Sequence, residues 1–156
     1  MATIRLQRED FDAAAESAAL TRGRSDIGAV VTFTGICRGS EAGEPIAALT
    51  LEHFAEMAEA EIARHVAEAE RRWALLGVTV IHRYGRIMPG ENIVLVVTAS
   101  SHRGEAFAAA EFLMDYLKTR APFWKQVEGV QSKTWVEARA DDDAAAGRWD
   151  RPKGSA

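Results

Sequence analysis

The stretch RGEAFAAAEFLMDYLKTRAPFWK, residues 103–125, sets the layout of the rest of the chain. Apolar side chains recur through it at helical spacing: Ala106, Phe107, Ala110, Leu113, Met114 and Leu117. This stripe predicts an amphipathic helix over Arg103–Arg120. Pro122 disfavours helical dihedral angles at the residue before it, so the helix should end there. A strand, predicted over Phe123–Val127, should follow directly.

Two lysines flank this helix end. Lys118 lies in the last turn of the predicted helix, and Lys125 lies on the strand after it. A lysine from a helix end and a lysine from the adjoining strand can converge on one pocket for an anionic substrate, or one of them can have a lowered pKa. The alternative is that Lys118 and Arg120 only complement the negative end of the helix dipole.

The remaining chain alternates strands and helices. Further strands are predicted at Thr3–Leu6, Ile27–Cys37, Ile46–Phe54, Val78–Tyr84, Ile93–Ser100 and Lys133–Ala138. Further helices are predicted at Asp10–Leu20 and Ala55–Trp73, with a weak final helix from Asp141. The polar segment Arg38–Pro45 is predicted as a loop, and a turn is predicted around Met88–Gly90.

These elements predict an α+β fold: two long helices on a mixed sheet, with a small additional β subdomain around the two lysines. We expect a single domain over residues 1–149 and a polar, disordered tail over 150–156. No glycine-rich phosphate fingerprint follows either βαβ-like passage, which argues against a Rossmann fold.

Composition narrows the classes of function. The 156 residues carry a net charge of −4, which argues against binding to nucleic acid or an anionic membrane. A single cysteine, Cys37, excludes an intrachain disulfide and a cysteine-based zinc site. No apolar run is long enough to span a membrane and no signal-peptide core opens the chain, so we expect a cytoplasmic protein.

Two more places hold candidate functional residues. His102 and Arg103 follow two serines at the start of the Arg103–Arg120 helix, where free N–H groups favour an anion; the alternative is a serine N-cap with solvated side chains. Arg38 ends a strand at the start of a loop, where ligand-binding groups often lie. Beside it, Cys37 is either a nucleophile or persulfide carrier, or a small buried apolar residue, which is the commoner case.

The four histidines have no metal-ligand spacing, and His65 and His82 are predicted to be structural. We therefore expect no metal and no cofactor.

Several motifs together resemble one known family. They are VVTFTGICR (30–38), LTLEHF (49–54), VIHRYGRIMPGE (80–91), TASSHRGEAF (98–107), MDYLKTRAPFWK (114–125) and WVEAR (135–139). The chain is similar through them to the large, catalytic subunits of molybdopterin synthase, the MoaE family. The similarity covers nearly the whole chain, and MDYLKTRAPFWK together with SSHR is highly specific.

The resemblance implies an α/β-hammerhead fold and a sulfurtransferase activity. The family installs the two dithiolene sulfurs that convert cyclic pyranopterin monophosphate into molybdopterin. The sulfur comes from the C-terminal thiocarboxylate of a small ubiquitin-like subunit, whose tail inserts into the large subunit. The assembly is a heterotetramer built on a homodimer of large subunits.

The resemblance also implies site residues. Lys118 matches the family's essential lysine and Lys125 its second active-site lysine. The substrate-binding residues match Phe33, Arg38, His102, Arg103 and Met114. The chain departs from the family at Cys37, in the loop after Arg38, and at Val127–Glu128, where the acid is displaced by one residue; because side chains alternate along a strand, no role is given to Glu128.

Two alternatives remain beside sulfur transfer from a thiocarboxylate: a non-catalytic module that docks a ubiquitin-like protein, and a persulfide sulfurtransferase that uses Cys37. The sequence also bears on assembly. Arg103 and Lys118 are fifteen residues apart on one helix, or roughly 22 Å. If both contact one substrate, the His102–Arg103 end is expected to come from a second copy of the chain.

Overall fold

The computed structural model describes residues 2–129, 133–136 and 140–150. Its first sheet has four strands in the order β1-β5-β7-β2. These strands are β1 (Ala2–Gln7), β5 (Leu75–Arg83), β7 (Asn92–Ser100) and β2 (Ala29–Ile36). β1 is parallel to β5, whereas β5 and β2 both run antiparallel to β7. The predicted mixed sheet is therefore confirmed, and β2 forms one of its edges.

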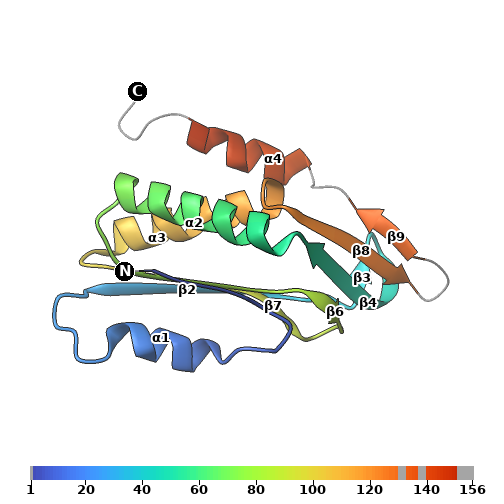
Figure 1. The fold of residues 1–156 in the computed structure, drawn as a ribbon, viewed down its shortest axis with the longest axis horizontal. Helices are drawn as coiled ribbons and strands as arrows, with labels where there is room; N and C mark the ends of the chain where they lie inside the picture. Colours follow the sequence, from blue (N-terminus) through green and yellow to red (C-terminus); the bar gives the residue numbers. More distant parts are fainter. Residues whose placement is uncertain (1, 130–132, 137–139, 151–156) are drawn as a thin grey trace.

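Helices cover both faces of this sheet (Figure 1). The two long helices, α2 (Ala55–Arg72) and α3 (Arg103–Thr119), pack side by side on one face, and the short α1 (Ala13–Thr21) lies on the other. The last elements, α4 (Ala140–Gly147) and the 3-10 turn η1 (Arg148–Asp150), lie on the outer side of the α2–α3 layer.

The main core lies between the sheet and the two long helices. Helix α2 buries one stripe at helical spacing, which consists of Ala58, Ile62, Val66 and Ala69. Helix α3 contributes the predicted apolar stripe, of which Leu113 is almost fully buried, while Phe107 stays exposed. Alternate residues of β7 face this core, including Val94 and Val96. Burial of this apolar surface is the main force that holds the helices on the sheet.

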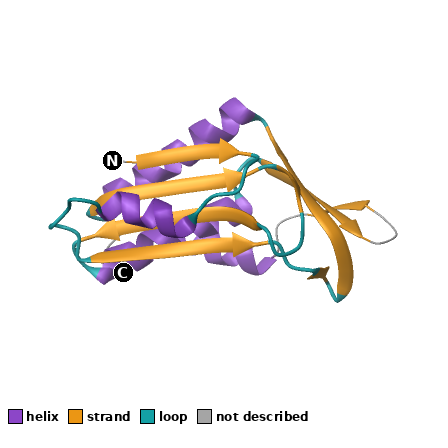
Figure 2. Ribbon diagram, turned by 90° about the horizontal axis from the view of Figure 1, so that it is seen from below, coloured by secondary structure: helices purple, strands orange, loops and turns teal. Residues whose placement is uncertain are grey.

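A second sheet, of five strands, extends from one end of the first (Figure 2). Its strand order is β3-β4-β8-β9, and a short strand β6 also pairs with β4. The strands are β3 (Ser40–Glu41), β4 (Glu44–His53), β6 (Gly85–Ile87), β8 (Phe123–Gly129) and β9 (Lys133–Val136). A separate apolar cluster fills the space under it: Cys37, Leu49, Leu51, Ile87 and Val127. This sheet is the predicted additional β subdomain.

The chain enters the second sheet directly from β5 and again directly after α3. The chain leaves β5, bends at Gly85, which has φ 87°, and continues as β6 in the second sheet. Helix α3 is followed at once by β8, because Pro122 prevents the helix from continuing. The N–H groups of Arg120 and Ala121 both donate to the carbonyl of Tyr116, which closes the last turn. The end of α3 therefore lies at the junction of the two sheets.

The structure corrects two local predictions. The segment Arg38–Pro45, predicted as a loop, contains β3 and the start of β4, joined by a two-residue turn. Its central residues, Ala42 and Gly43, both have positive φ, as the type I′ hairpin turn requires. Strand β6 was not predicted, because its three residues are ordered by pairing with β4 rather than by a local pattern.

The α+β fold class is confirmed. The single domain over residues 1–149 stays a prediction. The predicted tail, residues 150–156, lies outside the described residues except for Asp150, which belongs to η1. Among the described helices, none is both long and apolar enough to cross a membrane.

Candidate functional site

Lys118 lies in the last turn of α3, exposed, at the junction of the sheets. It is close enough to His82 on β5 for its charge to help lower the pKa of that histidine. The ring of His82 stacks on Phe123, the first residue of β8, with centroids 4.0 Å apart. Phe123 lies two residues before Lys125, and alternate residues of a strand share a face. The end of α3, the end of β5 and the start of β8 thus bring both lysines to one region.

Lys125 points toward the second apolar cluster from β8. It pairs in register with Leu51 of β4, and Val127, on the same face, is buried in that cluster. Glu128 directly follows Val127, so its side chain lies on the other face of β8, where it forms an ion pair with Arg86 at 3.1 Å. The reservation about Glu128 is therefore supported, because its carboxylate lies on the other face of the strand from Lys125.

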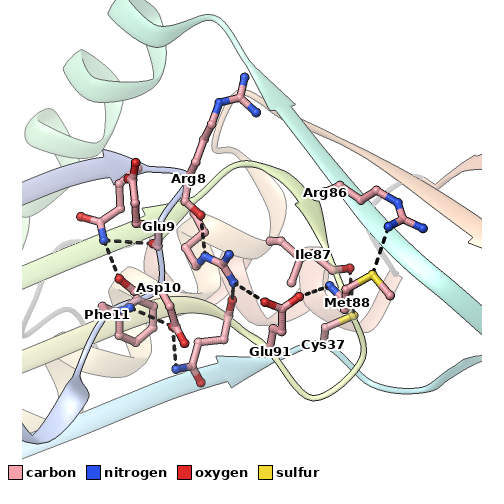
Figure 3. Close-up of polar contacts among 12 residues, drawn as sticks. Arg8, Glu9, Asp10, Phe11, Cys37, Arg86, Ile87, Met88 and Glu91 are labelled. Atoms are coloured by element: carbon pink, nitrogen blue, oxygen red, sulfur yellow. Dashed lines mark hydrogen bonds and ion pairs between the residues drawn. The ribbon is translucent and has the colours of Figure 1, made fainter.

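The loop that follows β6 lies beside Cys37 (Figure 3) and holds the backbone just before Arg38. The N–H of Cys37 donates to the carbonyl of Glu91 at 2.8 Å, and the N–H of Gly90 donates to the carbonyl of Cys37 at 2.7 Å. The Glu91 carboxylate accepts the N–H of Met88 at 2.6 Å. These bonds fix the backbone on one side of Arg38, while its side chain stays exposed.

A carboxylate that was not predicted connects two of the candidate cations. Glu41, on β3, lies 3.5 Å from the guanidinium of Arg38 and 3.7 Å from the ammonium of Lys125, with a different oxygen facing each. The structure therefore brings Arg38 and Lys125 together around Glu41. No sequence signal indicated this contact, because it depends on the β3–β4 hairpin, which was predicted as a loop.

Cys37 is buried at the base of the same turn, with 3% of its surface exposed. Its thiol lies within weak hydrogen-bonding distance of two carbonyl oxygens, that of Arg38 at 3.6 Å and that of Ile87 at 3.9 Å. Burial raises the pKa of the thiol, and the nearby charge of Lys125 offsets only part of that effect. A buried, protonated thiol is a poor nucleophile, so the inert interpretation of Cys37 is the better one.

Phe33 and Met114 occupy different environments. Phe33 lies on the edge strand β2 and is 39% exposed. It lies two residues after Val31, and alternate residues of a strand share a face. Because Val31 packs against the main core, Phe33 lies on the α3 side of the sheet. Met114 is only 9% exposed and packs within that core, one helical turn before Lys118. Phe33 is exposed enough to contact a ligand directly, whereas the substrate-binding role of the buried Met114 stays a prediction.

His102 and Arg103 lie at the opposite end of α3 from Lys118. His102 is the N-cap residue and Arg103 begins the helix; both are exposed. The alternative of a serine N-cap is wrong, because His102 occupies the N-cap position; Ser100 instead donates to the carbonyl of Ala74 at 2.8 Å. Within one chain the structure separates these two residues from Lys118 by the length of the helix, roughly 22 Å.

A hollow of about 260 Å³ lies elsewhere, between α2, α3 and η1. Tyr116 lines it, and Tyr116 and Lys118 are two residues apart, which places them roughly 160° apart around the helix. The arginines around the hollow pair with carboxylates: Arg64 with Glu61, Arg71 and Arg72 with Glu68, and Arg120 with Asp150. The hollow is therefore distinct from the region of Lys118 and Lys125, neither of which lines it. Among the described residues, no group of histidine, cysteine or acidic side chains is arranged to hold a metal.

Comparison with known proteins identifies the family to which this chain belongs. The family described as MoaE protein matches residues 6–120, which is most of the chain. The molybdopterin synthase catalytic subunit of Mesorhizobium japonicum is 60% identical over 149 residues, covering 94% of this chain and 92% of the relative.

Solved structures share the fold. The molybdopterin biosynthesis MoaE protein from Burkholderia ambifaria superposes with a TM-score of 0.82 at 48% identity, over 97% of this chain and 99% of the other. The molybdopterin synthase structure from Staphylococcus aureus superposes with a TM-score of 0.77 at 26% identity, over 84% and 94% of the two chains. An α+β fold with two linked sheets is thus common to the class. The chain belongs to the MoaE protein family.

Proposed function

We propose that this chain acts as the catalytic subunit of a molybdopterin synthase, a sulfurtransferase of molybdenum cofactor biosynthesis. The reaction transfers sulfur from the C-terminal thiocarboxylate of a small ubiquitin-like subunit to cyclic pyranopterin monophosphate and forms the molybdopterin dithiolene. The observation that carries this proposal is the 60% identity, over 94% of the chain, to a relative named for that role.

The candidate cations suit the proposed substrate. A pyranopterin monophosphate is anionic, while the chain as a whole has a net charge of −4. Binding therefore needs a local cluster of positive charge, which Arg38 and Lys125 provide at the junction of the sheets. The exposed ring of Phe33 on β2 offers a flat apolar surface for a ring system.

Lys118 is the proposed catalytic residue. Its ammonium group is exposed at the end of α3, and the proposal is that it meets the thiocarboxylate end of an inserted tail. Sulfur transfer from an acyl group places negative charge on the carbonyl oxygen, and a fixed cation stabilises that charge. A lysine at this place also suits a covalent adduct with the tail, or proton transfer if its pKa falls. In each case the reaction depends on this one amine.

The partner follows from the proposed chemistry. The relatives are named as subunits, so their enzymes have at least one further chain. We propose that this chain binds a small ubiquitin-like protein through its flexible C-terminal Gly-Gly tail. A narrow channel lined by backbone groups admits glycine and excludes larger side chains.

The assembly is proposed to be a heterotetramer built on a homodimer. In this arrangement His102 and Arg103 of one copy complete the phosphate site of the other, because one helix is too long for both of its ends to reach one substrate. A two-fold axis would create two equivalent sites.

Reconstitution tests the proposed function. The chain is mixed with the pyranopterin substrate and a thiocarboxylated partner, and the dithiolene product is measured. Deletion of the last two residues of the partner should abolish product formation. Unchanged turnover after that deletion would exclude tail insertion as the source of sulfur.

A further inference from the structure

Glu41 lies between two cations of the proposed substrate site. Its carboxylate oxygens face Arg38 at 3.5 Å and Lys125 at 3.7 Å. Arg38 and Glu41 are three residues apart in the segment that follows β2, whereas Lys125 lies on β8, so two distant segments meet at this point. Two positive charges and one negative charge leave a net charge of one positive unit.

The hairpin places Glu41 there. The turn at Ala42 and Gly43 fixes the register of β3 on β4, so that Glu41 lies directly opposite Glu44. Two carboxylates opposite each other on a strand pair repel. The two cations offset this repulsion for Glu41, whose side chain is 26% exposed.

Both contacts are loose. Neither distance is that of a charge-assisted hydrogen bond, for which nitrogen and oxygen approach to about 2.8 Å. The Arg38 side chain is also 69% exposed, and ion pairs of this kind contribute little to stability. The carboxylate therefore balances the charge of the site without locking its geometry, and a stronger anion can replace it.

We propose that Glu41 is a built-in counter-ion that occupies the Arg38–Lys125 pair until the phosphate group of the substrate displaces it. The proposal rests on the proposed function, which gives this site an anionic substrate. A monoanion gains little when it replaces one carboxylate with another. A phosphate dianion gains one full unit of charge interaction with both cations, so the exchange favours phosphate esters over singly charged molecules.

Coulomb's law gives the direction in which loss of the Glu41 charge changes the affinity for an anion. Removing the Glu41 charge leaves both cations free for an incoming anion and removes a repulsive charge a few ångströms away. The Arg38 side chain is largely exposed, so the screening is close to that of water, and one unit charge at about 4 Å then changes affinity by about three- to tenfold. A role in holding Arg38 and Lys125 in place would give the opposite sign, because its loss would weaken binding.

The matched pair Glu41→Gln and Glu44→Gln tests this inference. Both substitutions lie on the same hairpin, keep the side-chain size and change the net charge by one unit. Titration of the isolated chain with inorganic phosphate, followed by calorimetry or NMR, should show about three- to tenfold tighter binding for Glu41→Gln. Glu44→Gln should stay within about twofold of the wild type, because its carboxylate does not bridge the two cations.

A double variant shows where the gain arises. In an Arg38→Ala background, Glu41→Gln should lose most of its effect on phosphate affinity. Equal or weaker phosphate binding by Glu41→Gln, or the same gain from Glu44→Gln, would overturn the inference. The proposed function is judged separately: if the wild type forms product and Glu41→Gln does not lower KM for the pterin phosphate, only the counter-ion role fails.

Discussion

His82 is buried beside Lys118 and stays neutral. Its ring stacks on Phe123, and its Nδ1 nitrogen lies 2.8 Å from the carbonyl oxygen of Arg83, to which it donates. Burial is the main reason that the pKa of His82 falls to about 4. At neutral pH His82 therefore adds no positive charge beside Lys118.

This histidine makes stability depend on pH. In the unfolded chain His82 takes up its proton near its ordinary pKa of about 6.5, whereas in the folded chain it resists protonation down to about 4. The unfolded state binds more protons between these values, so stability is lost as pH falls from about 6.5 to about 4. The contribution reaches about 3 kcal/mol at the acidic limit.

The substitution His82→Phe should remove this contribution while keeping a ring against Phe123. Urea unfolding at pH 7 and pH 4.5 should show a smaller loss of unfolding free energy for His82→Phe than for the wild type. His102→Ala, at the exposed start of α3, serves as the control. Between pH 7 and pH 4.5 it should lose as much unfolding free energy as the wild type does. Equal acid sensitivity of His82→Phe and the wild type would contradict the assignment.

The start of α3 depends on a glycine in the neighbouring strand. Gly28, just before β2, donates its N–H to the carbonyl of Ser100 at 2.9 Å. A Cβ atom at Gly28 would lie 2.1 Å from the carbonyl oxygen of Ser101, which is a contact with backbone that cannot rotate away. Only glycine allows this approach, which places His102 at the N-cap of the helix.

We predict that Gly28→Ala destabilises the protein by about 2 kcal/mol through this clash. The matched control is Gly104→Ala on the second residue of α3, where a Cβ atom meets nothing within 4 Å. That substitution should raise stability by about 0.5–1 kcal/mol, because alanine favours the helix. Thermal unfolding separates the two variants, and similar melting temperatures would refute the role of Gly28.

Local patterns predicted some elements and missed others. The apolar stripe and Pro122 placed α3 to within one residue of its observed end, because both signals act within a few residues. Strands β3 and β6 were missed, since β6 is stabilised by pairing with a segment more than thirty residues away. The same limit applies to the site: Lys118, Lys125 and Arg38 came from motifs, whereas the position of Glu41 depends on the hairpin.

The fold of the whole molecule separates the candidate cations into two groups. Arg38, Lys118 and Lys125 lie near the junction of the two sheets, while His102 and Arg103 lie at the far end of α3. The resemblance implied one site for all of them, but it did not show which copy of the chain supplies each residue. A helix of this length cannot bring its own two ends together, which is why a second copy is proposed.

Subunit mixing tests that proposal. Chains with Arg103→Ala and chains with Lys118→Ala should each be inactive, because each lacks one half of both sites. After subunit exchange, a mixed dimer contains one site with both wild-type residues, so part of the activity should return. If exchange is confirmed by mass spectrometry and no activity returns, the two residues do not meet across a dimer.

The most direct measurement compares product formation by the wild type, Lys118→Ala and Arg120→Ala with pyranopterin monophosphate and the thiocarboxylated partner. Arg120 lies two residues after Lys118, pairs with Asp150 and lines the separate hollow, so its loss controls for charge at the helix end. The wild type and Arg120→Ala should form the dithiolene product, and folded Lys118→Ala should form none. Wild-type turnover by folded Lys118→Ala would contradict the proposed role of this lysine, and no product from the wild type would contradict the proposed enzyme activity.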